Sequence, residues 1–468
     1  MPGHLSHPSA NRDTRGSTHP SPAAALAIIL VVSLTALPTF AADTQAPSRL
    51  TLAHAVKSAI DHSPRVAAAS GRSEAARQRI DEAVAAGLPR LWITANATRF
   101  EEPMIVTPIH AFSPGLQPDF DESVALASLT VEQSLWDGGR RRSRTLQASS
   151  EADLAELGQT SSSQAIALQT SAIYLDILTV RETLDAQNAR LRSLAEELDR
   201  VHRLREVGRA AEIEILRVEA TIAAAESDKV ALESRLDASE RSLARLTGLD
   251  LAATRAVNLT GVEMPEAQAS REEIESIAVS GNPDARIART SILSADAGID
   301  VARSAYFPEV LVAGAINGYG SPDVSFETEW QVGVRLRVPL WDGGATSSRV
   351  AAATAMREAA KRNLDETDLI VRNRVDATLA QISGSAATVS SLGKAVARFE
   401  EVARIEKLRL DLGAGTQTDY LRAEADLVQA RAALSAARYR HVMARIELAS
   451  VTGEIGADWI ENHVRNAS

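Results

Sequence analysis

The chain has 468 residues, of which 45% are hydrophobic and only 4% aromatic, and it contains no cysteine. This composition supports a folded core of long, closely packed helices, and the lack of cysteine excludes disulfides, thiol chemistry and a lipid-anchored cysteine. The 50 basic and 61 acidic residues give a net charge of -11 spread along the chain. That balance argues against a nucleic-acid-binding protein.

The N-terminal sequence is typical of a leader that directs export. The apolar run "AAALAIILVVSLTALPTFAAD" ends in small residues at Thr39 and Ala41, where a signal peptidase can cut. We therefore predict a signal peptide over residues 1–41. The alternative is a single membrane anchor, but Thr35 and Pro38 interrupt the run before it reaches the length of a membrane helix.

The segment "LWDGG" occurs twice, at 135–139 and at 340–344, which are 205 positions apart. Two further pairs share this offset, Gly208 with Gly413 and Gly248 with Gly453. Upstream, Pro64 matches Pro283 and Pro89 matches Pro308 at an offset of 219, so the first copy carries 14 extra residues. The pattern predicts a tandem duplication. Its parts are a first repeat at 42–248, a linker at 249–270, a second repeat at 271–453 and a C-terminal tail at 454–468.

A pair of β-strands is expected before each LWDGG. The predicted strands lie at about 89–100 and 123–136 in the first repeat and at about 308–320 and 326–341 in the second. In the last of them Val332, Val334 and Leu336 alternate with Arg335 and Arg337, so one face suits lipid or a core and the other suits water. Each strand is long enough to cross an outer membrane. The extra residues fall in the Pro-rich loop between the first two strands.

Long helices are expected after each LWDGG. Neither stretch from Gly139 to Val207 nor from Gly344 to Leu412 contains a proline. The apolar positions recur at helical spacing, as in a coiled-coil seam; in the second repeat they are Val375, Leu379, Ile382, Ala386 and Val389. Gly208 and Gly413 then fit turns that reverse the chain into a second helix of about 35 residues, with a hairpin tip near each glycine.

The position of LWDGG between strand and helix explains its duplication. Four strands per chain cannot close a membrane barrel, and open edges are not tolerated in lipid, but three chains would supply twelve. A tryptophan suits the membrane interface, and the following Asp-Gly-Gly ends the strand and caps the helix. The expected strand-to-helix junctions are Trp136, Asp137, Gly138 and Gly139 in the first repeat and Trp341, Asp342, Gly343 and Gly344 in the second.

Four features in this order resemble the TolC family of outer-membrane efflux proteins over about 50–453: "LTLAHAVKSAIDHSPRVAAA", the two LWDGG segments, the two helix turns and the closing "SVTG". The resemblance implies a mostly α fold with a β-barrel portion, in which a homotrimer forms a twelve-stranded barrel and long antiparallel helices form a periplasmic α-barrel. It places the chain in the outer membrane of a Gram-negative bacterium, in contact with outer-membrane lipid and extending into the periplasm. Its implied partners are a periplasmic adaptor (membrane fusion) protein and an inner-membrane transporter.

The resemblance also assigns roles to residues near the two tips. Adaptor docking falls to Val207, Gly208 and Arg209 in the first repeat and to Leu412, Gly413 and Ala414 in the second. The pore constriction falls to Asp419, whose carboxylates in a threefold ring would select cations. The next ring position carries Arg422, a departure that weakens cation selectivity and allows an ion pair with Asp419. Glu214 takes the matching place in the first repeat.

A run of four arginines follows the first LWDGG: Arg140, Arg141, Arg142 and Arg144. We interpret it as lacking a counterpart in the second repeat. Two roles are open, a solvated face or contact with lipid headgroups at the periplasmic leaflet.

No enzyme motif is present: the histidines are scattered, and there is no phosphate-binding loop or nucleophile elbow. We therefore expect no catalysis, no cofactor and no metal site. A rival of another class is an exported, non-channel coiled-coil structural protein, which leaves the strands and the paired LWDGG unexplained. Within the duct hypothesis, a passive exit duct for tripartite efflux and an outer component of type I protein secretion use the same architecture, and the sequence does not separate them.

Overall fold

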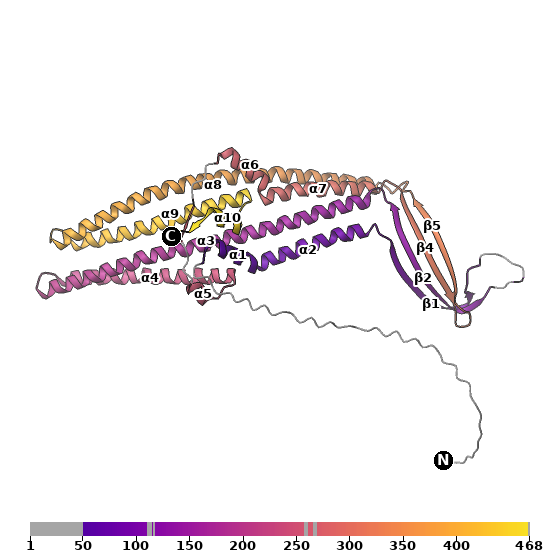
Figure 1. Ribbon diagram of the computed structural model, residues 1–468, viewed down its shortest axis with the longest axis horizontal. Helices are drawn as coiled ribbons and strands as arrows, with labels where there is room; N and C mark the ends of the chain where they lie inside the picture. Colours follow the sequence, from indigo (N-terminus) through magenta and orange to yellow (C-terminus); the bar gives the residue numbers. More distant parts are fainter. Residues whose placement is uncertain (1–49, 110–114, 116–117, 257–260, 265–268, 467–468) are drawn as a thin grey trace, which may run out of the picture. The chain divides into compact units, whose positions relative to one another are not determined.

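The computed structural model describes residues 50–109, 115, 118–256, 261–264 and 269–466. The predicted signal peptide at 1–41 lies outside these residues. The fold consists mainly of long helices and a four-stranded sheet, which confirms the predicted fold class (Figure 1).

The same series of elements occurs twice along the chain. The first series is α1 (Leu52–His62), α2 (Pro64–Ala85), β1 (Arg90–Ile105), β2 (Phe120–Trp136), α3 (Arg140–Glu206) and α4 (Glu212–Thr247). The second series is α6 (Arg271–Gly281), α7 (Pro283–Ser304), β4 (Glu309–Gly320), β5 (Glu327–Arg337), α8 (Ala345–Asp411) and α9 (Gln417–Thr452). Between them lie α5 (Leu251–Ala256) and β3 (Val262–Glu263), and after them α10 (Ala457–His463) and β6 (Arg465–Asn466).

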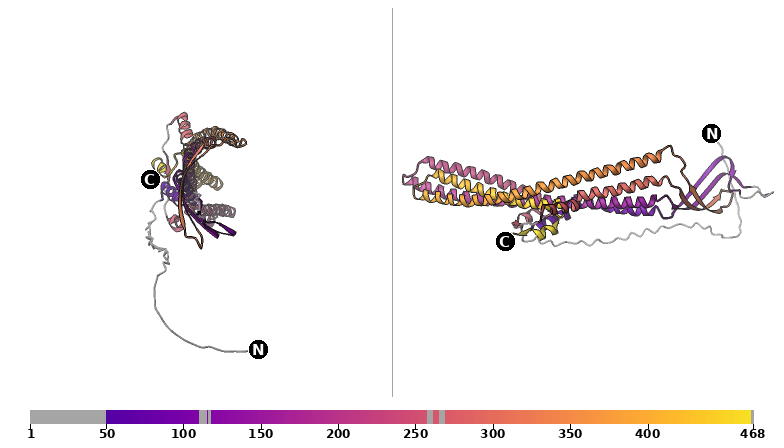
Figure 2. Two further views of the ribbon diagram at one scale, coloured as in Figure 1. Left: turned by 90° about the vertical axis from the view of Figure 1, so that its right-hand side faces the viewer. Right: turned by 90° about the horizontal axis from the view of Figure 1, so that it is seen from above.

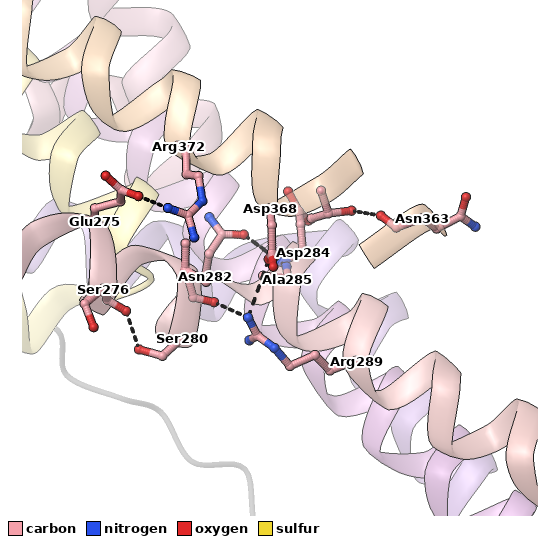
Figure 3. A network of polar contacts seen from close by, with 12 residues as sticks. Glu275, Ser276, Ser280, Asn282, Asp284, Ala285, Arg289, Asn363, Asp368 and Arg372 are labelled. Atoms are coloured by element: carbon pink, nitrogen blue, oxygen red, sulfur yellow. Dashed lines mark hydrogen bonds and ion pairs between the residues drawn. The ribbon is translucent and has the colours of Figure 1, made fainter. Parts of the chain in front are cut away.

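The helices α2 and α7 begin alike because the sequence around each start is repeated. Each has a proline at its first position, where the missing N–H costs nothing. Ser63 caps α2 by accepting from the N–H of Val66, whereas Asn282 caps α7 by accepting from the N–H groups of Asp284 and Ala285. Figure 3 shows the second of these starts, where Asn282 lies among side chains of α6, α7 and α8.

The long helices α3 and α8 have 67 residues each, a length of roughly 100 Å at 1.5 Å per residue. Each is followed by a glycine with positive φ, Gly208 at 71° and Gly413 at 75°. Other residues meet a steric penalty in this conformation, so glycine is the natural choice for the turn. The return helices α4 and α9 have 36 residues each.

The strands form one antiparallel sheet in the order β1-β2-β4-β5, so β1 and β5 are its two edges. The helices that adjoin these strands lie side by side in the matching order α2-α3-α7-α8, as a curved layer in the end-on view of Figure 2. Toward the two tips, α4 packs on α3, α3 on α9 and α9 on α8. Each strand therefore continues into, or comes from, the helix in the same position of the helical layer.

Three strand limits differ from those expected from the sequence. β1 continues to Ile105 instead of 100, and β2 begins at Phe120 instead of 123, because these residues extend the hairpin across a register shift between Arg99 and Met104. β5 ends at Arg337 instead of 341. Pro339 has no N–H to donate to a ladder, so the strand cannot continue through it.

The largest core cluster lies where α1 packs on α3 and α10. Its largest fully buried side chain is Tyr174, whose hydroxyl donates to the carbonyl of Leu50 at 2.7 Å. The predicted linker and tail also contribute to this core through Val262 and Ile460, and β3 pairs with β6. These two segments are thus part of the folded body instead of simple connections.

The expected apolar seam is largely present, with one error. In α3, Leu194 and Val201 are fully buried in a cluster near the tips, and in α8 Val375 is fully buried. Ala386 was expected in the seam but is exposed, and the neighbouring Ser385 is buried instead. Its hydroxyl lies 2.9 Å from Nδ1 of His441.

Candidate functional site

Both Asp-Gly-Gly junctions fold in the same way. The glycines have positive φ in each, 69° and 85° at Gly138 and Gly139 and 67° and 86° at Gly343 and Gly344. The buried carboxylate of Asp137 accepts from the N–H of Arg141 at 3.0 Å. In this way an aspartate placed before the glycines satisfies a free N–H of the first helical turn.

Asp342 makes more contacts than its counterpart in the first repeat. Its Oδ2 accepts from both the N–H and the hydroxyl of Thr346, at 2.8 and 2.6 Å, and its Oδ1 accepts from the N–H of Gly344 at 3.1 Å. The hydroxyl bond from Thr346 is the main reason why the pKa of Asp342 lies below its ordinary value. The charged form of the cap is therefore favoured.

The two junction tryptophans differ in their surroundings. Trp136 packs edge-on against Phe307, with ring centroids 6.2 Å apart, and is 44% exposed. Trp341 follows the edge strand β5 and is 89% exposed. Phe307 precedes β4, the strand paired with β2, so Trp136 has a neighbour within the chain.

The arginine run does not form one uniform surface. Arg140 Nη2 lies 2.6 Å from Glu309 Oε1, and Arg141 Nε lies 3.4 Å from Asp137 Oδ2. Part of the run is thus held by internal ion pairs. The interpretation that the run lacks a counterpart is wrong for Arg144, since Arg349 stands 205 positions later and contacts Asp342 at 3.5 Å.

The predicted docking residues lie in the two hairpin turns. In the first turn the N–H of Arg209 donates to the carbonyl of Leu204 at 2.7 Å, and that of Gly208 to Arg205 at 2.9 Å. This pair of bonds is a Schellman motif, which requires a left-handed residue such as glycine. Ala414 and Gly413 repeat both bonds in the second turn, to the carbonyls of Arg409 and Leu410.

Large apolar side chains are exposed at both turns. Val207 is 66% exposed and Leu412 is 73% exposed, immediately before the two glycines. Arg209 and Ala414, which follow the glycines, are exposed as well. The six residues expected to dock an adaptor thus form two small exposed turns with an apolar residue at the same place in each.

The expected constriction residues lie in the first turns of the return helices. Thr416 caps α9, its hydroxyl accepting from the N–H of Asp419 at 3.1 Å and lying 2.7 Å from Asp419 Oδ2. The exposed Asp419 carboxylate is therefore held by the same hydroxyl that caps the helix. No ion pair joins it to Arg422, which is also exposed and within the described residues. Glu214 occupies the matching position of α4, where Ala211 provides no hydroxyl.

A polar contact between the two hairpins was not anticipated from the sequence. Glu197 of α3 is buried, makes two 2.8 Å bonds with Arg200 and accepts from Gln417 Nε2 at 3.1 Å. The bond with Glu197 raises the pKa of Arg200. Nearby, Arg217 Nη1 donates to the hydroxyl of Thr418 at 2.9 Å. Residues about 200 positions apart leave no periodic signal, so only the fold shows that they meet.

The sheet has one polar and one apolar face. Cross-strand pairs place Ser128 beside Asn317, and the two side chains bond at 2.7 Å. Residues on the other face are apolar and exposed: Leu91, Ile93, Leu129, Val131, Ile316, Trp330, Val332, Val334 and Leu336. An exposed apolar band of this size marks contact with lipid or with another protein.

Comparisons with known proteins identify the family. A family model described as outer membrane efflux protein matches residues 55–249 and 276–454. These segments cover most of the chain. The chain belongs to the outer membrane efflux protein family.

The chain aligns with relatives over most of its own length and most of theirs. The alkaline protease secretion protein AprF of Pseudomonas aeruginosa is 25% identical over 405 residues, which cover 84% of this chain and 82% of AprF. Outer membrane protein TolC of Vibrio cholerae is 23% identical over 413 residues, covering 86% and 91%. The solved structure of the outer membrane protein VceC from Vibrio cholerae shares the fold, with a TM-score of 0.72 at 18% identity and coverage of 86% of this chain and 96% of that chain.

Membership of this family of efflux and secretion channels places the chain in the outer membrane, with an extension into the periplasm. Among the described residues, none of the helices has the length and hydropathy of a transmembrane helix. In the same described ranges, no group of three or more histidine, aspartate or glutamate side chains is arranged to hold a metal ion.

Proposed function

We propose that the chain is the passive exit duct of a tripartite efflux system. Three copies would close a twelve-stranded barrel in the outer membrane, and their helices would line a periplasmic tunnel. An inner-membrane transporter and a periplasmic adaptor would deliver the substrate, and the duct itself would carry out no catalysis.

The observation that carries this proposal is the incomplete sheet. β1 and β5 have no further strand beside them in the described part of the chain, and the sheet presents an apolar band on one face. Unpaired backbone groups cannot remain in lipid, so a protein of the outer membrane with such a sheet needs more strands to complete a barrel. Copies of the same chain are the simplest source of those strands.

The hairpin turns support the expected docking role. The exposed Val207 and Leu412 offer apolar contact at equivalent places, and the Schellman motifs fix the backbone around Gly208 and Gly413. Rigid turns with exposed apolar residues suit a protein partner, since little ordering is needed on binding. We propose that Arg209 and Ala414 lie at the edge of this contact.

The contact of Asp419 with its cap residue Thr416 supports a pore role for Asp419. Its carboxylate is exposed but fixed at the first turn of α9 by Thr416, so three copies would place three carboxylates at one level. We propose that this ring attracts cations and that Arg422, one turn further along α9, reduces the effect. Glu214 would add a second, less fixed carboxylate from α4.

Site-directed crosslinking tests the duct and its partner together. The chain has no cysteine, so Ala211→Cys introduces a single thiol beside the first turn. We expect crosslinking in cells to capture a periplasmic adaptor, and heat-resistant trimers to appear in outer-membrane fractions. Ala231→Cys, exposed farther along α4, is the matched control and is expected to capture less adaptor. Monomeric protein outside the outer membrane would instead favour the coiled-coil structural protein.

Type I protein secretion is the second candidate function. Two relatives support it by name, the alkaline protease secretion protein AprF and the proteases secretion protein PrtF of Dickeya chrysanthemi. Identification of the captured adaptor separates the two, because its companion transporter determines whether small molecules or proteins are exported.

A further inference from the structure

Arginines gather on the polar face of the sheet, at the end that joins the helices. Cross-strand pairing places Arg90 opposite Glu132 and Arg337 opposite Glu309, and side chains paired in this way point to the same side of a sheet. The first turns of α3 add further arginines to the hollow next to these residues. We name this cluster the basal collar; its members are Arg90, Glu132, Asp137, Arg140, Arg141, Arg144, Glu309, Arg335 and Arg337.

The collar has more positive than negative groups. Its six arginines and three carboxylates leave a formal charge of six minus three, or +3, per chain. Glu309 is shared by Arg140 at 2.6 Å and Arg337 at 4.0 Å, and Asp137 is held by Arg141 at 3.4 Å. Within the described part of the chain, three collar arginines form no ion pair: Arg90, Arg144 and Arg335. Their guanidinium groups are available to a ligand.

On the polar face of the sheet, the positive charge is confined to the end that joins the helices. On β5 the polar face begins with Glu327 and Glu329 and ends with Arg335 and Arg337. Glu329 and Arg335 are six residues apart, roughly 20 Å along an extended strand. Because the screening length is about 8 Å at physiological ionic strength, the acidic end does not neutralise the basic end.

The internal repeat indicates that the collar stays positive when copies assemble. The position of Glu309 in the second repeat corresponds to Arg90 in the first, 219 positions earlier, and the position of Arg140 corresponds to Ala345, 205 positions later. Where Glu309 meets Arg140 inside the chain, a neighbouring copy would therefore bring Ala345 to Arg90. At this contact between copies, the repeat therefore places no carboxylate next to Arg90.

We propose that the basal collar is an anion-binding zone of the channel, which attracts small solutes with carboxylate or phosphate groups. Guanidinium groups bind both kinds of anion through paired N–H donors. This inference rests on the proposed function, because the polar face lines a lumen only if the sheet closes into a barrel. The collar would lie where the barrel joins the helices, and its positive charge would be opposite in sign to the negative charge of the Asp419 ring near the tips.

Planar-bilayer recordings with inorganic pyrophosphate as the probe test the proposal. The purified trimer is inserted into neutral phosphatidylcholine, and the reversal potential is measured in a KCl gradient at about 10 mM, where the screening length is about 30 Å, and again at about 1 M, where it is about 3 Å. We expect the double variant Arg144→Gln, Arg335→Gln to shift selectivity toward cations at low salt only. Half-blocking of the current should require about tenfold more pyrophosphate.

Two variants serve as controls. Arg142→Gln removes an exposed arginine of the same run that does not line the hollow, so it should leave both readouts unchanged. Arg335→Lys keeps the charge and should keep the selectivity, while losing part of the pyrophosphate block. Equal shifts in the double variant and in Arg142→Gln would overturn the proposal, as would pyrophosphate block that appears only in bilayers with anionic lipid.

Failure of the duct hypothesis can be told apart from failure of the collar. Absence of any conductance from the wild-type trimer would refute the duct. Calorimetry of pyrophosphate binding to the detergent-solubilised protein tests the collar independently of channel conductance. Binding that is lost in the double variant and kept in Arg142→Gln supports the collar, and equal binding by both refutes it.

Discussion

Replacement of Asn282 by alanine is expected to loosen two helix ends at once. Asn282 is only 3% exposed, and its Oδ1 accepts from the N–H groups of Asp284 at 2.9 Å and Ala285 at 3.4 Å. Its Nδ2 donates to the carbonyl of Val451 at 3.0 Å, which lies in the last turn of α9, where a carbonyl has no helical partner. Loss of the cap costs about 1 kcal/mol and the unpaired carbonyl about 1–3 kcal/mol, so we expect a local loss of about 2–4 kcal/mol.

The internal repeat provides the matched control, Ser63→Ala. Ser63 stands 219 positions before Asn282 and makes a single cap bond, at 3.4 Å to the N–H of Val66, so its loss should cost less than about 1 kcal/mol.

Hydrogen exchange followed by mass spectrometry, on the detergent-solubilised protein, measures the local opening of α2 and α7 separately. Since 1.4 kcal/mol is a factor of ten, the first turn of α7 in Asn282→Ala should exchange at least about 30-fold faster. Equal acceleration in the two variants would refute the importance of the bond to Val451.

Three further results are expected. Asp419→Asn should lower cation selectivity in planar bilayers while preserving the α9 cap, since an amide oxygen still accepts from Thr416; an unchanged reversal potential would count against a place in the pore. Gly413→Ala should destabilise the second tip by about 1–2 kcal/mol, because Gly413 has a positive φ. Gly393→Ala, within α8 and with open space around it, should instead stabilise the helix slightly. Thermal melting of the purified protein measures both effects. Burial raises the pKa of Glu424, so its contribution to stability is present below its ordinary pKa and is lost as the pH rises through the raised value. Glu424→Gln should therefore raise the melting temperature at pH 7 but not at pH 4. An equal gain at both pH values would contradict this sign.

Much of the fold follows from short-range patterns in the sequence. Alternation predicts the four strands, helical spacing predicts α3 and α8, and the repeated glycines predict the turns, because each signal depends on neighbouring residues only. Strand ends were less predictable: β1 extends beyond 100 through pairing with β2, which no local pattern encodes, while the end of β5 before Pro339 could have been read from the missing N–H.

Contacts between distant segments could not be predicted from the sequence. The Gln417 bond to Glu197 joins residues 220 positions apart, and β3 pairs with β6 across about 200 residues. The helix cap formed by Thr416 and Asp419 is different, since its Thr-x-x-Asp pattern is visible in the sequence. It explains how an exposed carboxylate can be fixed, which the resemblance to a family did not address.

The duplication also explains why the two junctions look unequal in one chain. Trp136 packs on Phe307, which belongs to the second repeat, and the residue that corresponds to Phe307 in the first repeat is Leu88, 219 positions earlier. Within one chain Leu88 and Trp341 are both exposed, the latter at the β5 edge. In a closed ring each repeat meets the next in the same way, so we expect Trp341 to pack on Leu88 of the neighbouring copy. The exposed second junction is then the unfilled half of a contact that the first junction already makes within the chain.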